Sequence, residues 1–441
     1  MKIINGDSLE VLKSMESDSL EALVTDPPYG LSKMTTENIK ECLTNWLSGE
    51  KYNHKEKGFM NKAWDSFVPS PNLWREVFRV LKPGAHGLVF AGSRTQDLMS
   101  ISLRLAGFEI RDTLMWIYGS GFPKSHNISK AIDKKLGTLK VVGQGRAGKN
   151  ALGQDSGYNK TYNPHTYDIV EANSEEAKEW NGWGTALKPA YEPIILVRKP
   201  PVGSIAQNTL DFGCGGINID ATRIQYSEDE NINFNAQQRQ QMSHDNGVYY
   251  IDHSSLIGKE VQKFKEKGRF PANVMIDEYI DHELMQRYFY CTKASKKEKE
   301  AGCEQLRKKT NMEITGRKKG SAGLTMRHEE RGGTPKSNPY AGISGEQPRA
   351  NTHPTVKPLD LMRYLVKMVV PPSGTALDPF CGSGSTLCAL ALENMNGIGI
   401  ELQEEYCEIA QARVKHWGGE AERVEQPNKQ LEELPLFKGL L

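Results

Sequence analysis

The sequence of 441 residues predicts an α/β protein with a doubly wound, mainly parallel sheet. Two observations support this fold class. Short apolar segments alternate with segments of helical periodicity near both ends of the chain, and parallel strands require such crossover helices. Neither end supplies enough strands for a sheet of its own. We therefore expect the two ends to share one sheet, with the segment from about 200 to 350 inserted between them.

The apolar runs of the N-terminal half predict strands at 2–5, 21–25, 87–91 and 109–116. Helical spacing predicts helices at 8–14 and at about 73–81, and a third helix that ends near 106. The helix at 73–81 is stopped by Lys82, Pro83 and Gly84. The polar stretch from 30 to 65 has no predicted element. In the C-terminal half, the same patterns predict helices at 358–369, 385–394 and 404–417, and strands at 375–377 and 397–400.

The composition is that of a globular protein, with 38% hydrophobic and 25% charged residues. The formal net charge is only +1, so a polyanionic partner would have to bind a local basic patch. The seven cysteines include no C-x-x-C pair, which argues against a disulfide framework and a zinc site, and we predict no metal. No apolar run reaches about 18 residues and no signal-peptide core is present, so we expect a cytoplasmic protein without a membrane segment.

Two segments outside the predicted sheet are basic. Residues 119–150 hold seven Lys or Arg and one acidic residue, and residues 286–350 hold fifteen Lys or Arg and seven acidic residues. A single run of this kind is often a solvated surface, but two in one protein favour a groove for a polyanion. The basic residues that we expect to contact the polyanion are Lys124, Lys130, Lys134, Lys135, Arg317, Lys318, Lys319 and Arg327.

A glycine-rich segment, DPFCGSGST at 378–386, lies where a predicted strand passes into a helix. Gly382 and Gly384 let the backbone approach a ligand, and the helix start offers free N–H groups to an anion. An ordinary tight turn is the alternative for the glycine pair alone. Glu401, at the end of the next predicted strand, has the spacing of the acid that binds ribose in adenosine cofactors. Leu387 replaces the third glycine of a dinucleotide site, which disfavours a nicotinamide cofactor.

A second motif, DPPY at 26–29, follows another predicted strand. Neither proline can donate a hydrogen bond, so the turn presents backbone carbonyls beside one carboxylate and one aromatic ring. Such a cluster can accept hydrogen bonds from an amino group. The alternative is a turn whose tyrosine packs on the core.

Together, the two motifs resemble those of the S-adenosylmethionine-dependent amino-methyltransferases of DNA, which methylate an exocyclic amine. DPPY precedes the glycine-rich loop, as in the permuted beta class of this family, and the resemblance implies a Rossmann-like sheet. The segments 5–9, 81–84 and 353–358 also resemble the family, and the likeness covers 1–118, 186–200 and 351–416. It leaves the segment from 119 to 185 without an assigned role.

The resemblance implies S-adenosylmethionine as cofactor and a catalytic tetrapeptide composed of Asp26, Pro27, Pro28 and Tyr29. The cofactor residues that it implies are Asp378 and Phe380 for the methionine end, Glu401 for the ribose, Asp7 for the adenine amino group, Lys357 for the carboxylate, and Gly382, Gly384, Ser385 and Thr386 around them.

The implied reaction starts from a poor nucleophile, because the lone pair of an aromatic amine is delocalised into the ring. Hydrogen bonds from the amine to Asp26 and to the carbonyl of Pro27 would draw it towards tetrahedral geometry. The target base must leave the duplex to reach these groups, and Tyr29 would stack on it.

The leading hypothesis is a site-specific DNA adenine-N6 methyltransferase, because within the family Asp rather than Ser at position 26 favours adenine. Cytosine-N4 methylation and RNA adenine methylation stay open as alternatives. A nicotinamide-dependent oxidoreductase would leave the DPPY motif unexplained. A non-catalytic DNA-binding relative is disfavoured because both motifs are intact.

We divide the chain into a catalytic half (1–200, with a basic insertion at about 119–185), a target-recognition insertion (201–350), a cofactor-binding half (351–420) and a tail (421–441). Double-stranded DNA is the expected partner. We expect the protein itself to be bacterial or encoded by a phage or prophage. A homodimer and a cognate restriction endonuclease are left open. The amino-acid sequence does not indicate which DNA sequence is recognised, because residues 200–350 contain no recognisable helix-turn-helix or zinc module.

Overall fold

The computed structural model describes residues 1–56, 58, 63–119, 125–146, 166–225, 267–276, 289–310, 313–314, 348–418 and 420–424. The chain divides into two compact units. Unit 1 comprises Met1–Gly119, Tyr191–Cys303 and His353–Leu441, and unit 2 comprises Ser120–Ala190 and Glu304–Thr352. Unit 1 therefore combines segments from both ends and from the middle of the chain.

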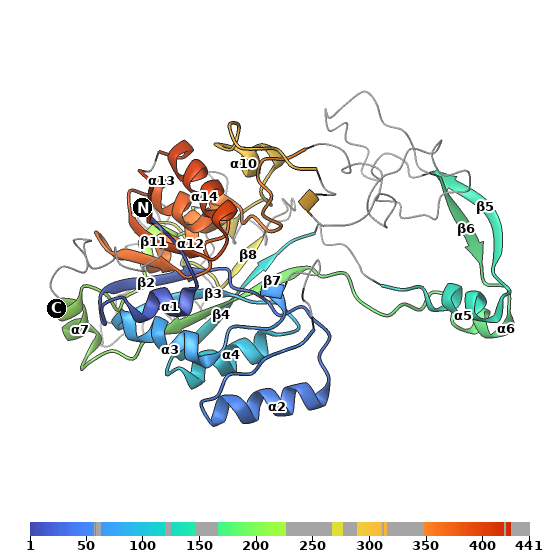
Figure 1. Ribbon diagram of the computed structural model, residues 1–441, viewed down its shortest axis with the longest axis horizontal. Helices are drawn as coiled ribbons and strands as arrows, with labels where there is room; N and C mark the ends of the chain where they lie inside the picture. Colours follow the sequence, from blue (N-terminus) through green and yellow to red (C-terminus); the bar gives the residue numbers. More distant parts are fainter. Residues whose placement is uncertain are drawn as a thin grey trace, which may run out of the picture. The chain divides into compact units, whose positions relative to one another are not determined.

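Unit 1 is built on a mixed sheet that has ten strands within the described residues, in the order β12-β1-β11-β10-β2-β3-β7-β4-β8-β9 (Figure 1). The strands from β12 to β3 are parallel, β7 is antiparallel to both neighbours, and β8 and β9 are parallel to β4. The strands are β1 (Lys2–Asn5), β2 (Leu20–Thr25), β3 (Leu81–Phe90), β4 (Glu109–Ile117), β7 (Tyr191–Arg198), β8 (Val274–Ile276), β9 (Phe289–Tyr290), β10 (Thr375–Asp378), β11 (Asn396–Glu401) and β12 (Glu422–Val424).

The two ends of the chain share this sheet, as the sequence predicts. β1 pairs with β11, where Ile3 lies opposite Gly399, and β2 pairs with β10, where Leu23 lies opposite Leu377. Because these strands are parallel, their carboxyl ends meet at one edge of the sheet. The residues that follow these strands are thereby brought together.

Helices cover both faces of the sheet, which makes the fold doubly wound and confirms the predicted α/β class (Figure 1). Ile4 and Leu23 belong to one core with α1, α3 and α4, and Ile3 and Ala22 belong to the other with α12, α13 and α14. Successive residues of a strand point to opposite faces, so one apolar run serves both cores. These helices are α1 (Ser8–Lys13), α3 (Pro71–Val80), α4 (Gln96–Leu105), α12 (Leu359–Val369), α13 (Ser385–Leu392) and α14 (Glu404–His416).

Some elements differ from the sequence-based expectation. The polar stretch from 30 to 65 contains α2 (Thr36–Leu47), because Thr35 and Asn38 form a capping box that starts a helix there. β3 begins at Leu81, so the predicted helix stop at 82–84 lies inside a strand, and a register shift against β2 accommodates it. β8 and β9 extend the sheet from a segment predicted as an insertion. The other described elements of unit 1 are α7 (Ile205–Phe212), α10 (Lys296–Glu300) and the 3₁₀ turns η2 (Ala63–Asp65) and η3 (Asp220–Thr222).

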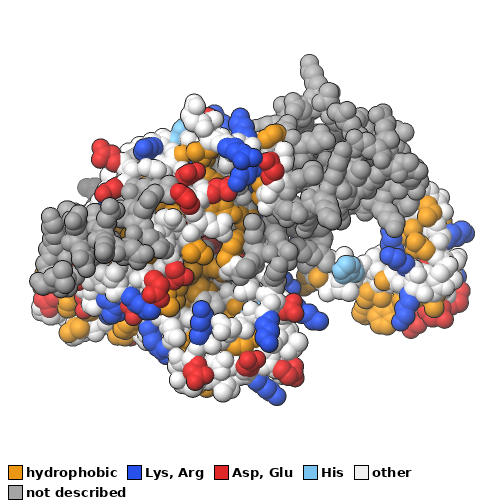
Figure 2. Space-filling view, viewed as in Figure 1, with side chains coloured by type: hydrophobic (Ala, Val, Ile, Leu, Met, Phe, Trp, Pro, Cys, Tyr) orange, Lys and Arg blue, Asp and Glu red, His pale blue; other side chains and the backbone are white. Residues whose placement is uncertain are grey.

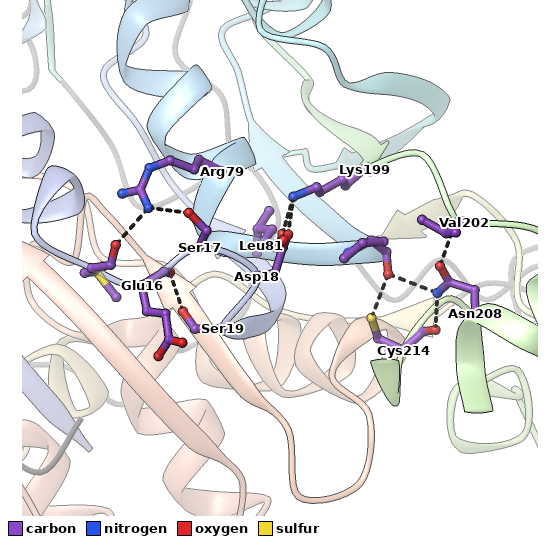
Figure 3. A network of polar contacts seen from close by, with 12 residues as sticks. Glu16, Ser17, Asp18, Ser19, Arg79, Leu81, Lys199, Val202, Asn208 and Cys214 are labelled. Atoms are coloured by element: carbon purple, nitrogen blue, oxygen red, sulfur yellow. Dashed lines mark hydrogen bonds and ion pairs between the residues drawn. The ribbon is translucent and has the colours of Figure 1, made fainter. Parts of the chain in front are cut away.

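A network of polar contacts holds the amino ends of β2 and β3 (Figure 3). Asn208 of α7 is fully buried, donates to the carbonyls of Pro83 and Cys214 at 2.9 Å each, and accepts from the N–H of Val202 at 2.9 Å. Lys199 donates to Asp18 at 2.6 Å in the same network. These contacts lie at the amino edge of the parallel strands, opposite to their carboxyl ends.

Unit 2 contains α5 (Ile128–Leu136), α6 (Glu175–Glu179) and an antiparallel pair, β5 (Lys140–Arg146) and β6 (Thr166–Glu171). Asp133 of α5 is buried, and its carboxylate accepts hydrogen bonds from the N–H groups of Asn173 and Ser174 at 2.9 and 3.0 Å. The bond from Asn173 is the main cause that holds the pKa of Asp133 below its usual range. The carboxylate thus ties α5 to the start of α6.

The compact units divide the chain near 119, 190, 303 and 352. Compactness does not test which segment reads a partner, so the predicted functional division at 200, 350 and 420 stays a prediction. Among the described residues, none of the helices is long and apolar enough to cross a membrane. Figure 2 shows Lys and Arg side chains interspersed with Asp and Glu on the described surface, in keeping with the small net charge.

Candidate active site

The predicted catalytic and cofactor motifs lie on adjacent strands of unit 1. Asp26 follows β2, and the glycine-rich loop follows β10, its immediate neighbour in the sheet. The hydroxyl of Thr25 donates a 2.7 Å hydrogen bond to Oδ1 of Asp378. The residue before the tetrapeptide is therefore bound directly to the first residue of the loop.

Lys357 lies in a cluster of charged and aromatic side chains. Its ammonium is 2.6 Å from Oδ2 of Asp26 and 3.3 Å from Oε2 of Glu192. The same nitrogen is 3.2 Å from the hydroxyl of Tyr29 and 4.8 Å from the ring centre of Phe90. The lysine side chain is only 9% exposed, against 19% for Asp26 and 23% for Glu192. One buried cation is thus shared by two carboxylates.

Burial and charge oppose each other at this lysine. Burial acts to lower the pKa of Lys357, but the charges of Asp26 and Glu192 outweigh it, so the pKa is raised. Burial, with the same two carboxylates, raises the pKa of the Tyr29 hydroxyl well above its usual value. At neutral pH the lysine is charged and the tyrosine neutral, and the Tyr29 hydroxyl donates to Oε2 of Glu192 at 3.1 Å.

Two glycines shape the loop between β10 and α13. Gly382 has φ of 52° and Gly384 has φ of 77°, both in the left-handed region that favours glycine. A Cβ atom on Gly382 would come within 2.7 Å of the His353 ring, and one on Gly384 within 2.9 Å of Ala410. Glycine is therefore required here by backbone conformation and by close packing of the protein itself.

Glu401, at the end of β11, holds the loop from beside it. Its Oε2 accepts the N–H of Gly382 at 2.9 Å and its Oε1 accepts the N–H of Gln403 at 2.8 Å. Burial raises the pKa of this carboxyl, and the two hydrogen bonds oppose that rise. The predicted ribose contact stays a prediction, and bracing of the loop is an additional role.

Asp378 is the most buried carboxyl of the site, with an exposed fraction of 2%. Besides the Thr25 hydroxyl, its Oδ1 accepts the N–H of Phe380 at 3.2 Å. Burial raises its pKa to about 6 despite these hydrogen bonds. Within the part of the chain that the structure describes, no cation forms an ion pair with it.

The other predicted cofactor residues are distributed around the loop. Asp7 is exposed and caps α1, where its side chain accepts two N–H groups of the first turn. The ring of Phe380 packs edge-on against Trp74, with ring centres 6.1 Å apart. Ser385 and Thr386 form the buried first turn of α13.

Sequence patterns did not single out Glu192 or Arg413. Glu192 is the second residue of the strongly apolar strand β7, and an acidic residue at that position is the signal that could have indicated it. Arg413, on α14, is fully buried behind the loop, where its Nη1 donates to the carbonyl of Ser383 at 2.7 Å and to the hydroxyl of Ser385 at 3.2 Å. Its Nε and Nη2 have no hydrogen-bond partner among the described residues.

The predicted DNA contacts are only partly within the described residues. Lys134 and Lys135 are exposed on α5 of unit 2, and Lys130 of the same helix is half-buried. Outside the described residues lie Lys124, Arg317, Lys318, Lys319 and Arg327. The predicted polyanion groove therefore stays a prediction.

Comparison with known proteins identifies relatives of this chain. It is 25% identical over 234 residues to the type II methyltransferase M.HindIII of Haemophilus influenzae, a match that covers 49% of this chain and 64% of that protein. It is 27% identical over 144 residues to the type II beta methyltransferase M.BslI of a Bacillus species, which covers 29% of this chain and 13% of the relative. The chain thus matches less than two thirds of the length of either relative.

Among solved structures, the complex of M1.HpyAVI with S-adenosylmethionine aligns over 94% of this chain and 99% of that one, with 14% identity and a TM-score of 0.37. The family model described as DNA methylase, which groups N6 and N4 methyltransferases, matches residues 20–412. That match spans both motifs and most of the chain. The chain belongs to this family of N6 and N4 DNA methylases.

Proposed function

We propose that this protein is a DNA methyltransferase of the permuted beta class that transfers a methyl group from S-adenosylmethionine to the N6 amine of a flipped-out adenine at a specific site. The observation that carries the proposal is the bond between Thr25 and Asp378. It joins the proposed amine-binding turn to the proposed cofactor loop. Methyl transfer requires an acceptor and a donor held side by side, which is what two neighbouring parallel strands provide.

The residues around the loop fit such a cofactor. Asp378 is a buried carboxylate without a cation partner in the described part of the chain, and the ammonium of a methionine group would supply the missing charge. Glu401 can bind ribose hydroxyls through the remaining lone pairs of its oxygens. The α13 start, with Ser385 and Thr386, and the exposed Asp7 complete the proposed site. The cofactor supplies an activated methyl group on a sulfonium.

The tetrapeptide holds the target amine. The hydrogen bond from Lys357 uses Oδ2 of Asp26, and the second oxygen, Oδ1, can accept from the amine. The carbonyl of Pro27 accepts the other amine hydrogen, so the nitrogen lone pair points away from both acceptors. Tyr29 stacks on the base, and its hydroxyl is kept in place by Glu192 and Lys357. After transfer, Asp26 is positioned to take the proton that the product ammonium releases.

Double-stranded DNA is the proposed substrate. A base in a duplex must be flipped out of the helix to reach this turn. Basic residues of unit 2, such as Lys134 and Lys135, would contact the phosphates. Adenine is favoured by the Asp at position 26, through resemblance to the family. Bacterial or phage origin, partnership with a restriction endonuclease and dimer formation are compatible with this proposal.

The experiment that tests the proposal uses isotope-labelled S-adenosylmethionine, duplex DNA and mass spectrometry of the resulting nucleosides. Labelled N6-methyl-2′-deoxyadenosine from the DNA is the expected product. Labelled N4-methyl-2′-deoxycytidine would replace the adenine assignment by the cytosine alternative. Labelled N6-methyladenosine, formed from RNA alone, would change the substrate. Asp26→Ala is the matched variant, since its turnover should fall by roughly 10²-fold or more while binding of the cofactor stays intact. Turnover above about a tenth of wild type in this variant contradicts the amine-binding role.

A further inference from the structure

Both backbone groups of Tyr29 are bound by side chains from distant parts of the chain. Its N–H donates to Oδ1 of Asp65 at 2.9 Å, and its carbonyl accepts the hydroxyl of Thr95 at 2.6 Å. The same Asp65 oxygen accepts the N–H of Gly30 at 3.1 Å. Asp65 and Thr95 are each 3% exposed. The turn that carries the proposed stacking residue is thus held from two sides.

The sequence of the turn explains why it needs an external acceptor. Pro27 and Pro28 have no N–H group, so Tyr29 and Gly30 provide the first backbone donors after Asp26. A buried N–H without a partner costs about 1 to 3 kcal/mol, and a carboxylate that accepts two of them forms charge-assisted hydrogen bonds. The Asp65 side chain therefore accepts hydrogen bonds from the last N–H of the tetrapeptide, at Tyr29, and from the next one, at Gly30.

The segment that carries Asp65 also packs against the turn. Gly30 has φ of 65°, and a Cβ atom there would come within 2.7 Å of the backbone nitrogen of Val68 and 2.9 Å of the carbonyl carbon of Phe67. The backbone at 67–68 therefore passes directly against the turn. Asp65, two residues earlier, is in place to accept from it.

We propose that Asp65 is a positioning residue for methyl transfer, which fixes the peptide groups of Tyr29 and Gly30 and so orients the Tyr29 ring towards the target base. The inference rests on the proposed function for its catalytic part. Tyr29 is then fixed at both ends: Asp65 and Thr95 hold its backbone, and Glu192 holds its hydroxyl. A fixed Tyr29 ring would hold the stacked base in one orientation, so that its amine reaches the carboxylate of Asp26.

Hydrogen exchange tests the structural part without any methylation assay. In the stretch from Pro27 to Gly30, the exchangeable backbone hydrogens are those of Tyr29 and Gly30, because prolines have none. Deuterium uptake in this stretch therefore reports on the Asp65 hydrogen bonds alone. Asp65→Ala should speed this exchange at least about 10-fold, and Asp65→Asn, which keeps an acceptor oxygen, should lie between it and the wild type.

Asn208→Ala is the matched control. Asn208 is as buried as Asp65 and likewise satisfies backbone groups, but it does so at the amino edge of the sheet (Figure 3). Its replacement should lower the stability of unit 1 and leave exchange at Tyr29 and Gly30 unchanged. General loosening of the unit is thereby separated from removal of the Asp65 hydrogen bonds.

Kinetics test the catalytic part. We expect kcat for Asp65→Ala to fall by about 10-fold to 10²-fold, with the cofactor Kd within about twofold of wild type and partial recovery of kcat in Asp65→Asn. kcat for Asn208→Ala should equal that of the wild type. If Asp65→Ala does not fold, Asp65→Asn carries both measurements against the same control.

Unchanged exchange at Tyr29 and Gly30 in the Asp65 variants would overturn the proposal. Faster exchange with an unchanged kcat would overturn the catalytic part, as would an Asp65→Asn kcat no higher than that of Asp65→Ala. A wild-type protein that methylates no nucleic acid would refute the proposed function instead, and the exchange measurement would still decide whether Asp65 holds the turn.

Discussion

Lys357 and Asp26 are separated by 331 positions in the sequence, and the lysine ammonium lies 2.6 Å from the aspartate carboxylate. Lys357 precedes α12 and Asp26 follows β2, so the ion pair joins the two ends of the chain. The resemblance to DNA amino-methyltransferases implies instead that Lys357 holds the carboxylate of the cofactor. The observed partners favour a role in orienting Asp26, and the two roles predict different kinetics.

Replacement of Lys357 by Met should lower kcat by about 10²-fold with an unchanged cofactor Kd, because the group that orients the Asp26 carboxylate is removed. Lys199→Met is the control, since Lys199 also forms a 2.6 Å ion pair but with Asp18 at the opposite edge of the sheet (Figure 3). Stopped-flow kinetics and calorimetry separate the two quantities. A higher Kd for the cofactor with an unchanged kcat would instead support the role of Lys357 in binding the carboxylate of the cofactor.

Glu401→Ala should weaken cofactor binding by roughly 1.5 to 3 kcal/mol, because the variant lacks the brace on Gly382 and would also lack the proposed charge-assisted hydrogen bonds to the ribose. Glu401→Gln keeps an acceptor for Gly382 but lacks the charge, so we expect an intermediate affinity. Isothermal titration calorimetry measures both. Equal affinity in wild type and Glu401→Ala would remove Glu401 from the cofactor site.

The raised pKa of Asp378 predicts a pH-dependent stability. Burial raises this pKa from 3.8 to about 6, so the folded protein binds the proton more tightly than the unfolded chain. The resulting stability is fully present below the unfolded pKa and is lost as the pH rises through about 6. The Asp378→Asn side chain does not ionise, so this variant should not lose stability as the pH rises.

We therefore expect the free energy of unfolding of Asp378→Asn, relative to wild type, to grow by up to about 3 kcal/mol between pH 4 and pH 7. Urea unfolding at several pH values in the absence of cofactor measures this difference. A difference that stays constant over the range would show that Asp378 ionises as freely in the folded protein as in the unfolded chain.

The lysines of α5 should act on DNA affinity without regard to sequence. Replacing Lys130, Lys134 and Lys135 by Gln should reduce the slope of log affinity against log salt by about 0.9 for each phosphate that the variant no longer neutralises. Lys13→Gln, on the exposed side of α1, is the control and should leave the slope unchanged. Fluorescence anisotropy with two unrelated duplexes measures the slopes. An effect confined to one duplex would indicate base readout instead of phosphate binding.

Local patterns were sufficient for the two motifs and for most of the sheet. Gly382 and Gly384 permit the left-handed backbone conformation that the loop adopts, and the two prolines of DPPY lack an N–H donor in any context. The strand-helix alternation predicted β1, β2, β10 and β11 within a residue or two, because period and breakers are properties of neighbouring residues. The expectation of no element between 30 and 65 was wrong for α2, since the apolar residues at 39, 42, 43, 46 and 47 have helical spacing and follow a capping box.

The sequence by itself therefore determined the fold class, the two motifs, the sharing of one sheet between both chain ends and the family. Tertiary structure alone decided which side chains surround the motifs. Asp65, Glu192 and Arg413 reach the site from η2, β7 and α14, and their contacts depend on strand order and register. A single acidic or basic residue in an element leaves no periodic pattern, so its partner becomes visible only when packing brings distant segments within hydrogen-bond distance.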